Sequence, residues 1–188
     1  MFKKLLAITS LFTAITTANA QTEVSTEGKV LHFLNPVNLQ LDEEDKNQPI
    51  FTCVAKLDTG AKTSSIHATN IRYNRELQRV TFVFEGQEFT KFVTREARIK
   101  QKNGAPPEIR PVITLDLEID GVTIENSEFT LADRSNFSTA ILIGRSILGP
   151  HQIITAIEEN SPYKTGEPCD INYSGENHTT ADNSYAPM

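Results

Sequence analysis

The residues best suited to chemistry lie at 58–60, where an apolar run ends in Asp-Thr-Gly within "VAKLDTGAKTSS" (54–65). A carboxylate that activates water must be reached by water and substrate while its position stays fixed, and a strand end followed by small residues offers both. Thr59 can lock the loop by hydrogen bonding, and Gly60 lets the backbone come close. The alternative is that Asp58 only shapes a turn, because composition alone yields such a triplet in roughly a few per cent of chains this long.

A second segment further along the chain has a similar break. The stretch "TAILIGRSILG" (139–149) is an apolar run that breaks at Gly144 and continues directly into Arg145. Its pattern predicts a short helix at 145–149, which ends at Gly149 and the proline that follows it. No other helix is expected.

The other apolar segments have the period of strands. They are rich in Val, Ile, Thr and Phe and are bounded by turn residues. Tight turns are expected at Gly86 and Gly121, because glycine tolerates the positive φ that hairpin turns demand. The expected strands are 51–57, 79–86, 87–94, 109–120 and 122–133. The sequence therefore predicts an all-β domain built from hairpins.

The first twenty residues have the three-part pattern of a secretory signal peptide: two lysines, an apolar centre and an Ala-Asn-Ala ending. Cleavage is expected after Ala20. The apolar centre at 5–15 is too short for a membrane span, which needs about 20 residues. We therefore expect an exported, periplasmic protein without a membrane span.

Composition divides the rest of the chain. From 159 onward it is rich in Asn, Ser, Thr, Pro and Gly, and it has too few apolar residues to offset the entropy lost on ordering. Residues 159–188 are therefore expected to form a largely disordered polar tail, and residues 28–158 a single folded domain.

The charge balance limits the partners of the protein. Removing Lys3 and Lys4 with the signal peptide leaves 16 basic residues against 24 acidic ones, a net charge of about −8. This balance argues against nucleic acid or an anionic membrane surface as the main partner.

The two cysteines, Cys53 and Cys169, leave two readings open. An oxidising compartment would permit one disulfide between them, and the alternative is two free thiols. Cys53 is disfavoured as a nucleophile, because it lies within a strand that looks buried and has no nearby histidine in the sequence.

The segments "LDTGAKTS" and "ILIGRSIL" together resemble the retropepsin-like aspartic peptidases. With "KLDTGAKTSSIHA" (56–68), "RPVITLDLEIDG" (110–121) and "LADRSNF" (131–137), the chain is similar to a bacterial branch of these proteins that is often labelled as ATP-dependent zinc proteases. The resemblance spans about residues 51–155, and the order of its motifs is specific. It covers neither residues 28–50 nor the tail.

This resemblance implies a closed β-barrel of the acid-protease fold with one short helix near the C-terminal end of the domain. It implies an aspartic endopeptidase that acts on a peptide or protein substrate, with Asp58 as the catalytic residue. Such enzymes use two carboxylates that share a proton, and this chain has one Asp-Thr-Gly, so a homodimer is expected. The alternative is an inactive module with the same fold that binds a peptide or a cell-envelope partner.

The resemblance also assigns supporting roles. The residues expected to support the active-site loop are Thr59, Gly60, Ala61, Gly144 and Arg145. Arg110 and Arg134 are candidates for contacts with the substrate or with the flap, the hairpin that closes over the substrate; a surface salt bridge is the alternative for each. The flap is expected at either Gly86 or the loop 100–108.

One residue departs from the family pattern. Viral-type retropepsins have an acidic residue directly after "DTGA", where it pairs with the arginine of the second motif; here that position is Lys62. Two cations side by side repel each other. Either another acid such as Asp133 pairs with Arg145, or the dimer is assembled differently.

The zinc and ATP parts of the label find little support in the residues. The sequence has no His-Glu-x-x-His and no Cys-x-x-Cys, and its four histidines are scattered. A site using Asp58 and His67 is conceivable, with a polar strand residue as the alternative for His67. No P-loop is present, since Ala61 separates the glycine from Lys62. We therefore expect no metal, no ATP and no cofactor.

Overall fold

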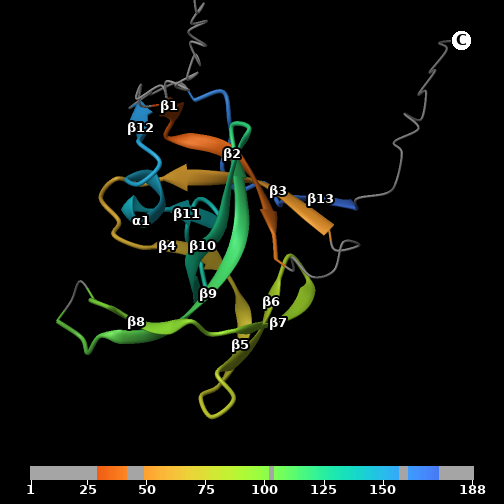
Figure 1. The fold of residues 1–188 in the computed structure, drawn as a ribbon, viewed down its shortest axis with the longest axis vertical. Helices are drawn as coiled ribbons and strands as arrows, with labels where there is room; N and C mark the ends of the chain where they lie inside the picture. The colour runs from red at the N-terminus through yellow and green to blue at the C-terminus, as the bar shows by residue number, and fades with distance from the viewer. Residues whose placement is uncertain (1–28, 42–48, 102–103, 157–160, 174–188) are drawn as a thin grey trace, which may run out of the picture.

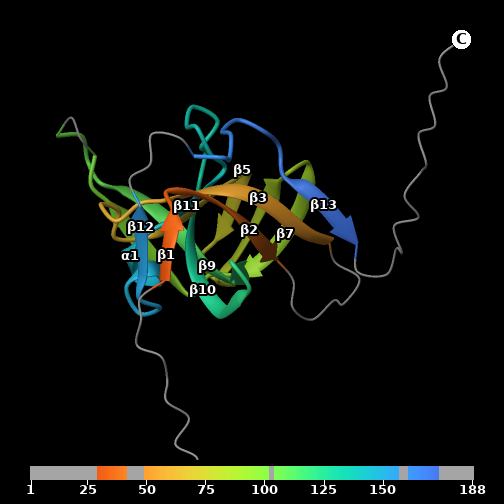
Figure 2. The same cartoon turned by 90° about the horizontal axis from the view of Figure 1, so that it is seen from above.

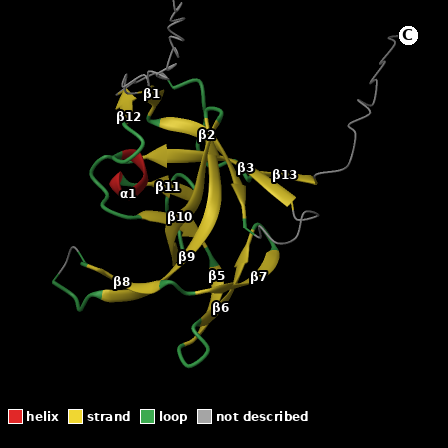
Figure 3. Ribbon diagram, in the orientation of Figure 1, coloured by secondary structure: helices red, strands yellow, loops and turns green. Residues whose placement is uncertain are grey.

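The structure is a computed structural model that describes residues 29–41, 49–101, 104–156 and 161–173. The expected signal peptide at 1–20 lies outside these residues. Figure 3 shows a fold made almost entirely of strands, with one short helix. In the described part of the chain, no helix is long and apolar enough to cross a membrane. The elements in chain order are β1 (Lys29–His32), β2 (Leu34–Gln40), β3 (Pro49–Leu57), β4 (Ser64–His67), β5 (Thr69–Asn74), β6 (Arg79–Phe84), β7 (Gln87–Phe92), β8 (Arg95–Ile99), β9 (Glu108–Ile119), β10 (Val122–Ala132), β11 (Ile141–Ile143), α1 (Arg145–Leu148), β12 (Ile153–Ala156) and β13 (Asp170–Tyr173).

Six of the strands close into a barrel. Each pairs with the next in the order β10, β4, β11, β3, β2 and β9, and β9 pairs with β10 to complete the ring. Figure 1 shows the long strands β9 and β10 side by side through the centre of the molecule. Strand β8 extends the sheet beyond β9, and β13 pairs with β3. The predicted closed all-β barrel is confirmed.

Two smaller sheets complete the described fold. Strands β5, β6 and β7 form a three-stranded sheet, and β1 pairs with β12 in parallel. Phe51 of β3 packs edge-to-face against Phe84 at 5.1 Å and Phe89 at 6.0 Å, measured between ring centroids. These aromatic contacts join the three-stranded sheet to the barrel, so both share one hydrophobic core.

The pleat of β3 determines how the strand presents its last residues. Its buried and half-buried residues alternate along the strand, and Phe51, Cys53 and Leu57 all face the core. Because Leu57 points inward at the end of the strand, the next residue, Asp58, is turned towards the surface. Asp58 is accordingly half-buried.

The predicted turns and helix are confirmed. Gly86 and Gly121 both have φ of +76°, and the residue before each also has a positive φ, as two-residue hairpin turns require. Helix α1 begins at Arg145, buries Ile147 and Leu148, and ends at Gly149. The sequence pattern did not predict β1, β2, β4, β5, β8 and β12.

The C-terminal part of the described chain is more ordered than its composition predicts. Cys53 and Cys169 form a disulfide across 116 residues, which resolves the choice between a disulfide and two free thiols. Residues 170–173 form β13 and pair antiparallel with β3. The expectation of a disordered tail over 159–188 is therefore wrong for these four residues, because the disulfide and the edge of β3 supply what composition lacks. Residues 174–188 lie outside the described part.

The aromatic contacts of Phe51 give a test of this core. We expect Phe51→Ala to lower the free energy of unfolding by about 3–5 kcal/mol, because it removes a fully buried ring and leaves a cavity. The matched control is Phe92→Ala, whose ring is 62 % exposed and stacks on Arg79, so its cost should stay near 1 kcal/mol. Chemical denaturation measures both; equal losses would contradict the shared core.

Candidate active site

Asp58 lies where two parallel barrel strands end together. Strands β3 and β11 pair in parallel with Leu57 opposite Ile143, so both chains leave the sheet at the same level. The backbone N–H of Asp58 donates to the carbonyl of Ile143 at 2.8 Å. The Asp-Thr-Gly loop is thus fixed to the second motif at its first residue.

The Asp58 carboxylate is held in place yet accessible. Its Oδ1 accepts hydrogen bonds from the backbone N–H groups of Gly60 at 2.9 Å and Ala61 at 3.2 Å. Its Oδ2 lies 3.7 Å from Lys56 Nζ, and 29 % of the side chain is exposed. One oxygen is therefore fixed by the loop while the group still reaches solvent, as activation of a water molecule requires.

Further hydrogen bonds join the Asp58 loop to the second motif. The N–H groups of Arg145 and Ser146 donate to the carbonyls of Ala61 at 2.9 Å and Lys62 at 3.0 Å. The buried N–H of Gly144 donates to Ser64 Oγ at 3.0 Å. The structure therefore brings together the loop residues 58–61 with Gly144 and Arg145, while the side chain of Thr59 stays exposed.

Gly144 is needed for this close approach. A Cβ at this position would lie 2.7 Å from both the carbonyl carbon and the carbonyl oxygen of Thr63. Those are backbone atoms, so the loop itself would have to move. Gly60 is less constrained, since its Cβ would lie 3.1 Å from Asp58 Oδ1.

A groove of about 710 Å³ begins beside this loop. Its lining includes residues 60–63, strand β8 with Lys100, and Ser65, Thr130 and Leu142 of the barrel strands. The hairpin of β8 and β9 is therefore the one next to Asp58. The Gly86 turn lies elsewhere, because Glu85 lines a different pocket beside the disulfide.

Two arginines that the sequence singled out line this groove. Arg134 is 6 % exposed; its backbone N–H donates to His67 Nδ1 at 2.9 Å and its Nε to the Thr139 carbonyl at 3.2 Å. Burial, together with repulsion from Arg110 and opposed by attraction to Asp58, lowers the pKa of Arg134 to about 10. Arg134 thus stays positively charged at neutral pH.

Arg110 has a partial surface salt bridge, as its alternative reading expects. Its Nη2 donates to Glu108 Oε2 at 2.6 Å, and this bond lowers the pKa of the Glu108 carboxyl. Its Nε, however, is buried and has no hydrogen-bond partner among the described residues. The guanidinium is therefore only partly neutralised by Glu108.

Ser65 is a groove residue that the sequence did not reveal. Its Oγ is buried and has no hydrogen-bond partner among the described residues. Among the buried side-chain nitrogen and oxygen atoms of the described ranges, this is otherwise true only of Arg110 Nε. Both atoms belong to residues of the same groove. Unpartnered polar atoms carry a cost of about 1–3 kcal/mol each, which a ligand can offset. No sequence signal distinguishes Ser65 from its serine neighbour Ser64.

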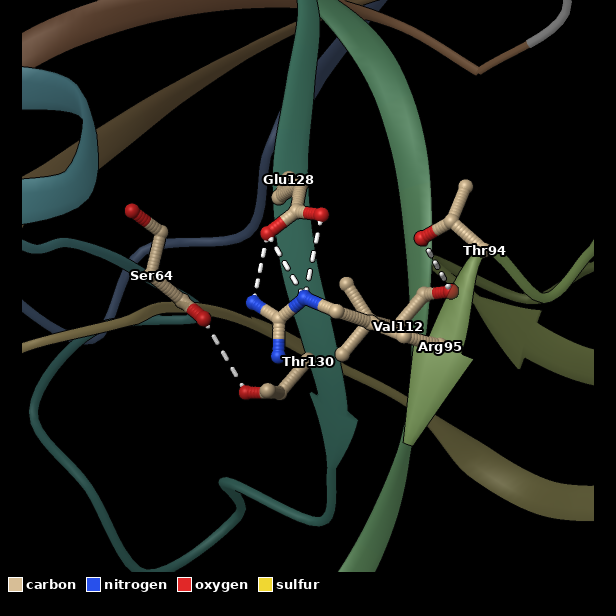
Figure 4. Close-up of polar contacts among 6 residues, drawn as sticks. All are labelled: Ser64, Thr94, Arg95, Val112, Glu128 and Thr130. Carbon is tan, nitrogen blue, oxygen red and sulfur yellow. Dashed lines mark hydrogen bonds and ion pairs between the residues drawn. The ribbon is translucent and has the colours of Figure 1, made fainter. Parts of the chain in front are cut away.

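The base of the β8–β9 hairpin is fixed to the barrel by an ion pair. Figure 4 shows Arg95 of β8 directed at Glu128 of β10, with Arg95 Nε 3.0 Å from Glu128 Oε2. This hydrogen bond raises the pKa of Arg95. Nearby, Thr130 Oγ1 donates to the carbonyl of Ser64 at 3.0 Å and joins β10 to β4. The groove wall is thus anchored next to the Asp58 loop.

Asp133, the acid that the sequence suggested as a partner for Arg145, does not pair with it. Asp133 instead accepts bonds from the N–H of Ser135 at 3.0 Å and its Oγ at 2.7 Å, and these bonds lower the pKa of its carboxyl. Among the described residues, no hydrogen bond or ion pair forms at the side chain of Arg145, and Lys62 is likewise exposed. Of the two alternatives, the one in which Asp133 pairs with Arg145 is therefore not found among the described residues.

His67 of β4 contacts the backbone of Arg134 and belongs to no group of metal ligands among the described residues. Its Nδ1 accepts the N–H of Arg134, so that nitrogen carries no proton, and the 3.8 Å approach of Asp133 is not an ion pair in this tautomer. Within the described ranges, no three His, Cys, Asp or Glu side chains lie together as metal ligands would.

Comparison with known proteins points to one family. The model of the family described as "RimB-like: Retropepsin-like aspartic endopeptidase RimB" matches residues 42–156. Among solved structures, the chain is similar to Lpg0085, a protein with unknown function (DUF785) from Legionella pneumophila subsp. pneumophila str. Philadelphia 1. The TM-score is 0.52 at 21 % identity, over 69 % of this chain and 94 % of that one. No curated protein matches the chain.

The approach of Gly144 to Thr63 gives a test of the loop. We expect Gly144→Ala to lower the free energy of unfolding by about 2 kcal/mol or more, because the new methyl group overlaps backbone atoms. The control is Ser146→Ala, whose side chain is exposed and whose backbone bond to Lys62 is kept. Thermal unfolding compares the two, and equal stability would refute the close contact.

Proposed function

The chain belongs to the RimB-like family of retropepsin-like aspartic endopeptidases, and from that premise we propose that it hydrolyses peptide bonds with water activated by Asp58. The observation that carries the proposal is the Asp58 carboxylate, which two backbone N–H groups hold in place at the end of β3 while it remains accessible. The alternative reading, a turn residue in an inactive peptide-binding relative, needs no such accessibility.

The active site is shared between two copies of the chain. Hydrolysis of this type uses two carboxylates and one proton: the ionised carboxylate removes a proton from water, and the protonated one polarises the scissile carbonyl. Each chain supplies one Asp-Thr-Gly. In a homodimer with two-fold symmetry, the two Asp58 side chains meet on the axis. The exposure of Thr59 and Gly60 supports this proposal, because a partner loop can contact them.

The groove lined by Arg110 and Arg134 holds the substrate. Its other charged residues are Lys62, Arg98 and Lys100, Arg95, which is paired with Glu128, and the acid Glu96. In a protein of net negative charge, this local excess of cations favours a substrate with anionic groups near the cleaved bond. Arg134 is the stronger candidate for direct contact, since Arg110 is partly neutralised by Glu108.

We propose that this activity lies outside the cytoplasm, in the periplasm, and the signal-peptide pattern of the first twenty residues supports this. A disulfide between Cys53 and Cys169 agrees with an oxidising compartment. The proposal involves no ATP and no nucleic acid. The substrate is a peptide or protein of that compartment.

The first test is cleavage of a diverse peptide library by the mature protein from acid to neutral pH. We expect Asp58→Asn to abolish cleavage, a loss of at least about 10³-fold, because an amide cannot take the proton from water. The control is Asp120→Asn, an exposed turn residue whose positive φ asparagine also tolerates. Cleavage retained by Asp58→Asn would refute the aspartic mechanism, and a loss caused only by a chelator would point to a metal enzyme.

A second test asks whether the site belongs to two subunits. Adding an excess of the Asp58→Asn protein to wild type should lower the activity per wild-type chain, because mixed dimers hold a single carboxylate. The same excess of Asp120→Asn protein should leave the activity unchanged or raise it. Sedimentation at the assay concentration reports the oligomer directly. Undiminished activity in the mixture with Asp58→Asn would mean that each chain works alone.

A further inference from the structure

The described chain continues past the residues that define the family. The family match ends at 156, whereas residues 161–173 cross the outside of the barrel and finish as β13. They begin near Tyr163, whose ring lies edge-on to His32 with centroids 6.0 Å apart. The barrel is closed without them, so their role lies elsewhere.

The far end of this segment is fastened to β3. One edge of β3 pairs with β11 through residues 55–57 and with β13 through residues 49–52. Cys53 lies between these two pairings and bonds to Cys169, and both cysteines are buried. The disulfide therefore secures the segment to the strand that ends at Asp58.

The middle of the segment supports the loop that carries Arg134. This Arg134 loop comprises residues 133–140, between β10 and β11. The N–H of Gly166 donates to the carbonyl of Ser138 at 3.0 Å. Figure 2 shows the segment, in blue, passing beside the loop, in teal. Residues 166–169 and most of residues 134–140 line one pocket of about 350 Å³.

The place of the Arg134 guanidinium depends on this loop. Its Nε donates to the carbonyl of Thr139, and its charge lies 4.7 Å from the centroid of the Phe137 ring. Both partners belong to the same loop and flank Ser138, the residue that Gly166 contacts. A shift of the loop would therefore carry the guanidinium away from the groove, because its fixing partners would move with it.

We propose that residues 161–173 are a strap, fastened by the Cys53–Cys169 disulfide, that holds the Arg134 loop against the barrel and so positions Arg134 in the substrate groove. The positioning of a substrate contact rests on the proposed function; the restraint on the loop does not. The disulfide links residues that are 116 positions apart, so it already holds the strap close to the barrel. Less chain entropy is then lost when the strap contacts the Arg134 loop.

Hydrogen exchange of the mature protein tests the restraint. In the Cys53→Ala/Cys169→Ala variant, we expect exchange at least about tenfold faster in the Arg134 loop and in residues 49–52, with residues 56–66 and 141–148 unchanged. The control is Gln87→Ala, which removes only the 3.4 Å exposed bond to Tyr173 and should leave the loop as in wild type. Unchanged exchange in the loop of the double variant would overturn the strap.

Gly166→Pro tests the same contact with the disulfide intact. Proline removes the N–H that Ser138 accepts and cannot adopt the φ of +83° found at Gly166. We expect faster exchange in the Arg134 loop alone. If the double cysteine variant is destabilised throughout, this variant decides: faster exchange in the loop supports the strap, and wild-type exchange refutes it.

Kinetics test the positioning of Arg134. With a peptide that wild type cleaves, we expect Gly166→Pro to raise KM about tenfold and to keep kcat within about twofold, because a charged hydrogen bond to the substrate is weakened while the hydrogen bonds that hold the Asp58 carboxylate are kept. A fall in kcat at constant KM would refute the positioning role. If wild type cleaves no peptide, the proposed function fails, and the exchange measurements still decide whether the strap restrains the loop.

Discussion

The interlocking of the ends of β3 and β11 is the constraint on which the site depends. The backbone bond from Asp58 to Ile143 fixes where the Asp58 loop leaves the barrel. The contact of Gly144 with Thr63 then allows the next residues to run side by side, within the reach of three more hydrogen bonds. The loop is held without a hydrophobic core of its own, because the backbone N–H groups of the second motif donate hydrogen bonds to the first motif. The backbone of the loop therefore holds Oδ1 of Asp58 in place, while the side chain remains accessible to solvent.

The buried arginine groups of the groove cost folding free energy. Arg134 is almost fully buried near Arg110, and the buried Nε of Arg110 has no hydrogen-bond partner among the described residues. A fold selected for stability alone would fill these positions with apolar side chains. Arg134, Arg110 and Ser65 lie together in one groove beside Asp58, which is where strain and unsatisfied groups have a functional explanation.

Sequence periodicity identified the long strands and the two glycine turns, because burial of alternate residues in β3, β9 and β10 leaves a clear pattern. It missed β2, which contains Pro36, and β4 and β8, which are too short to show a period. It also missed β13, which is held by the disulfide and by pairing with the edge of β3. The motif resemblance identified Asp58 and Gly144, because the two motifs that contain them can be recognised from their residues and their order along the chain. Ser65 and the partners of Arg134 depend on contacts between distant strands, and no local signal encodes these contacts.

Lys62 shows how the same loop can be joined without the acid of the viral-type pattern. An acid at 62 would join the loop to the arginine of the second motif through side chains. Here Lys62 makes the connection through its carbonyl, which accepts the N–H of Ser146, and the Ala61 carbonyl accepts that of Arg145. Because these bonds involve only the backbone, they do not depend on which side chain is present at position 62. Both cations point to solvent, where screening makes their repulsion small.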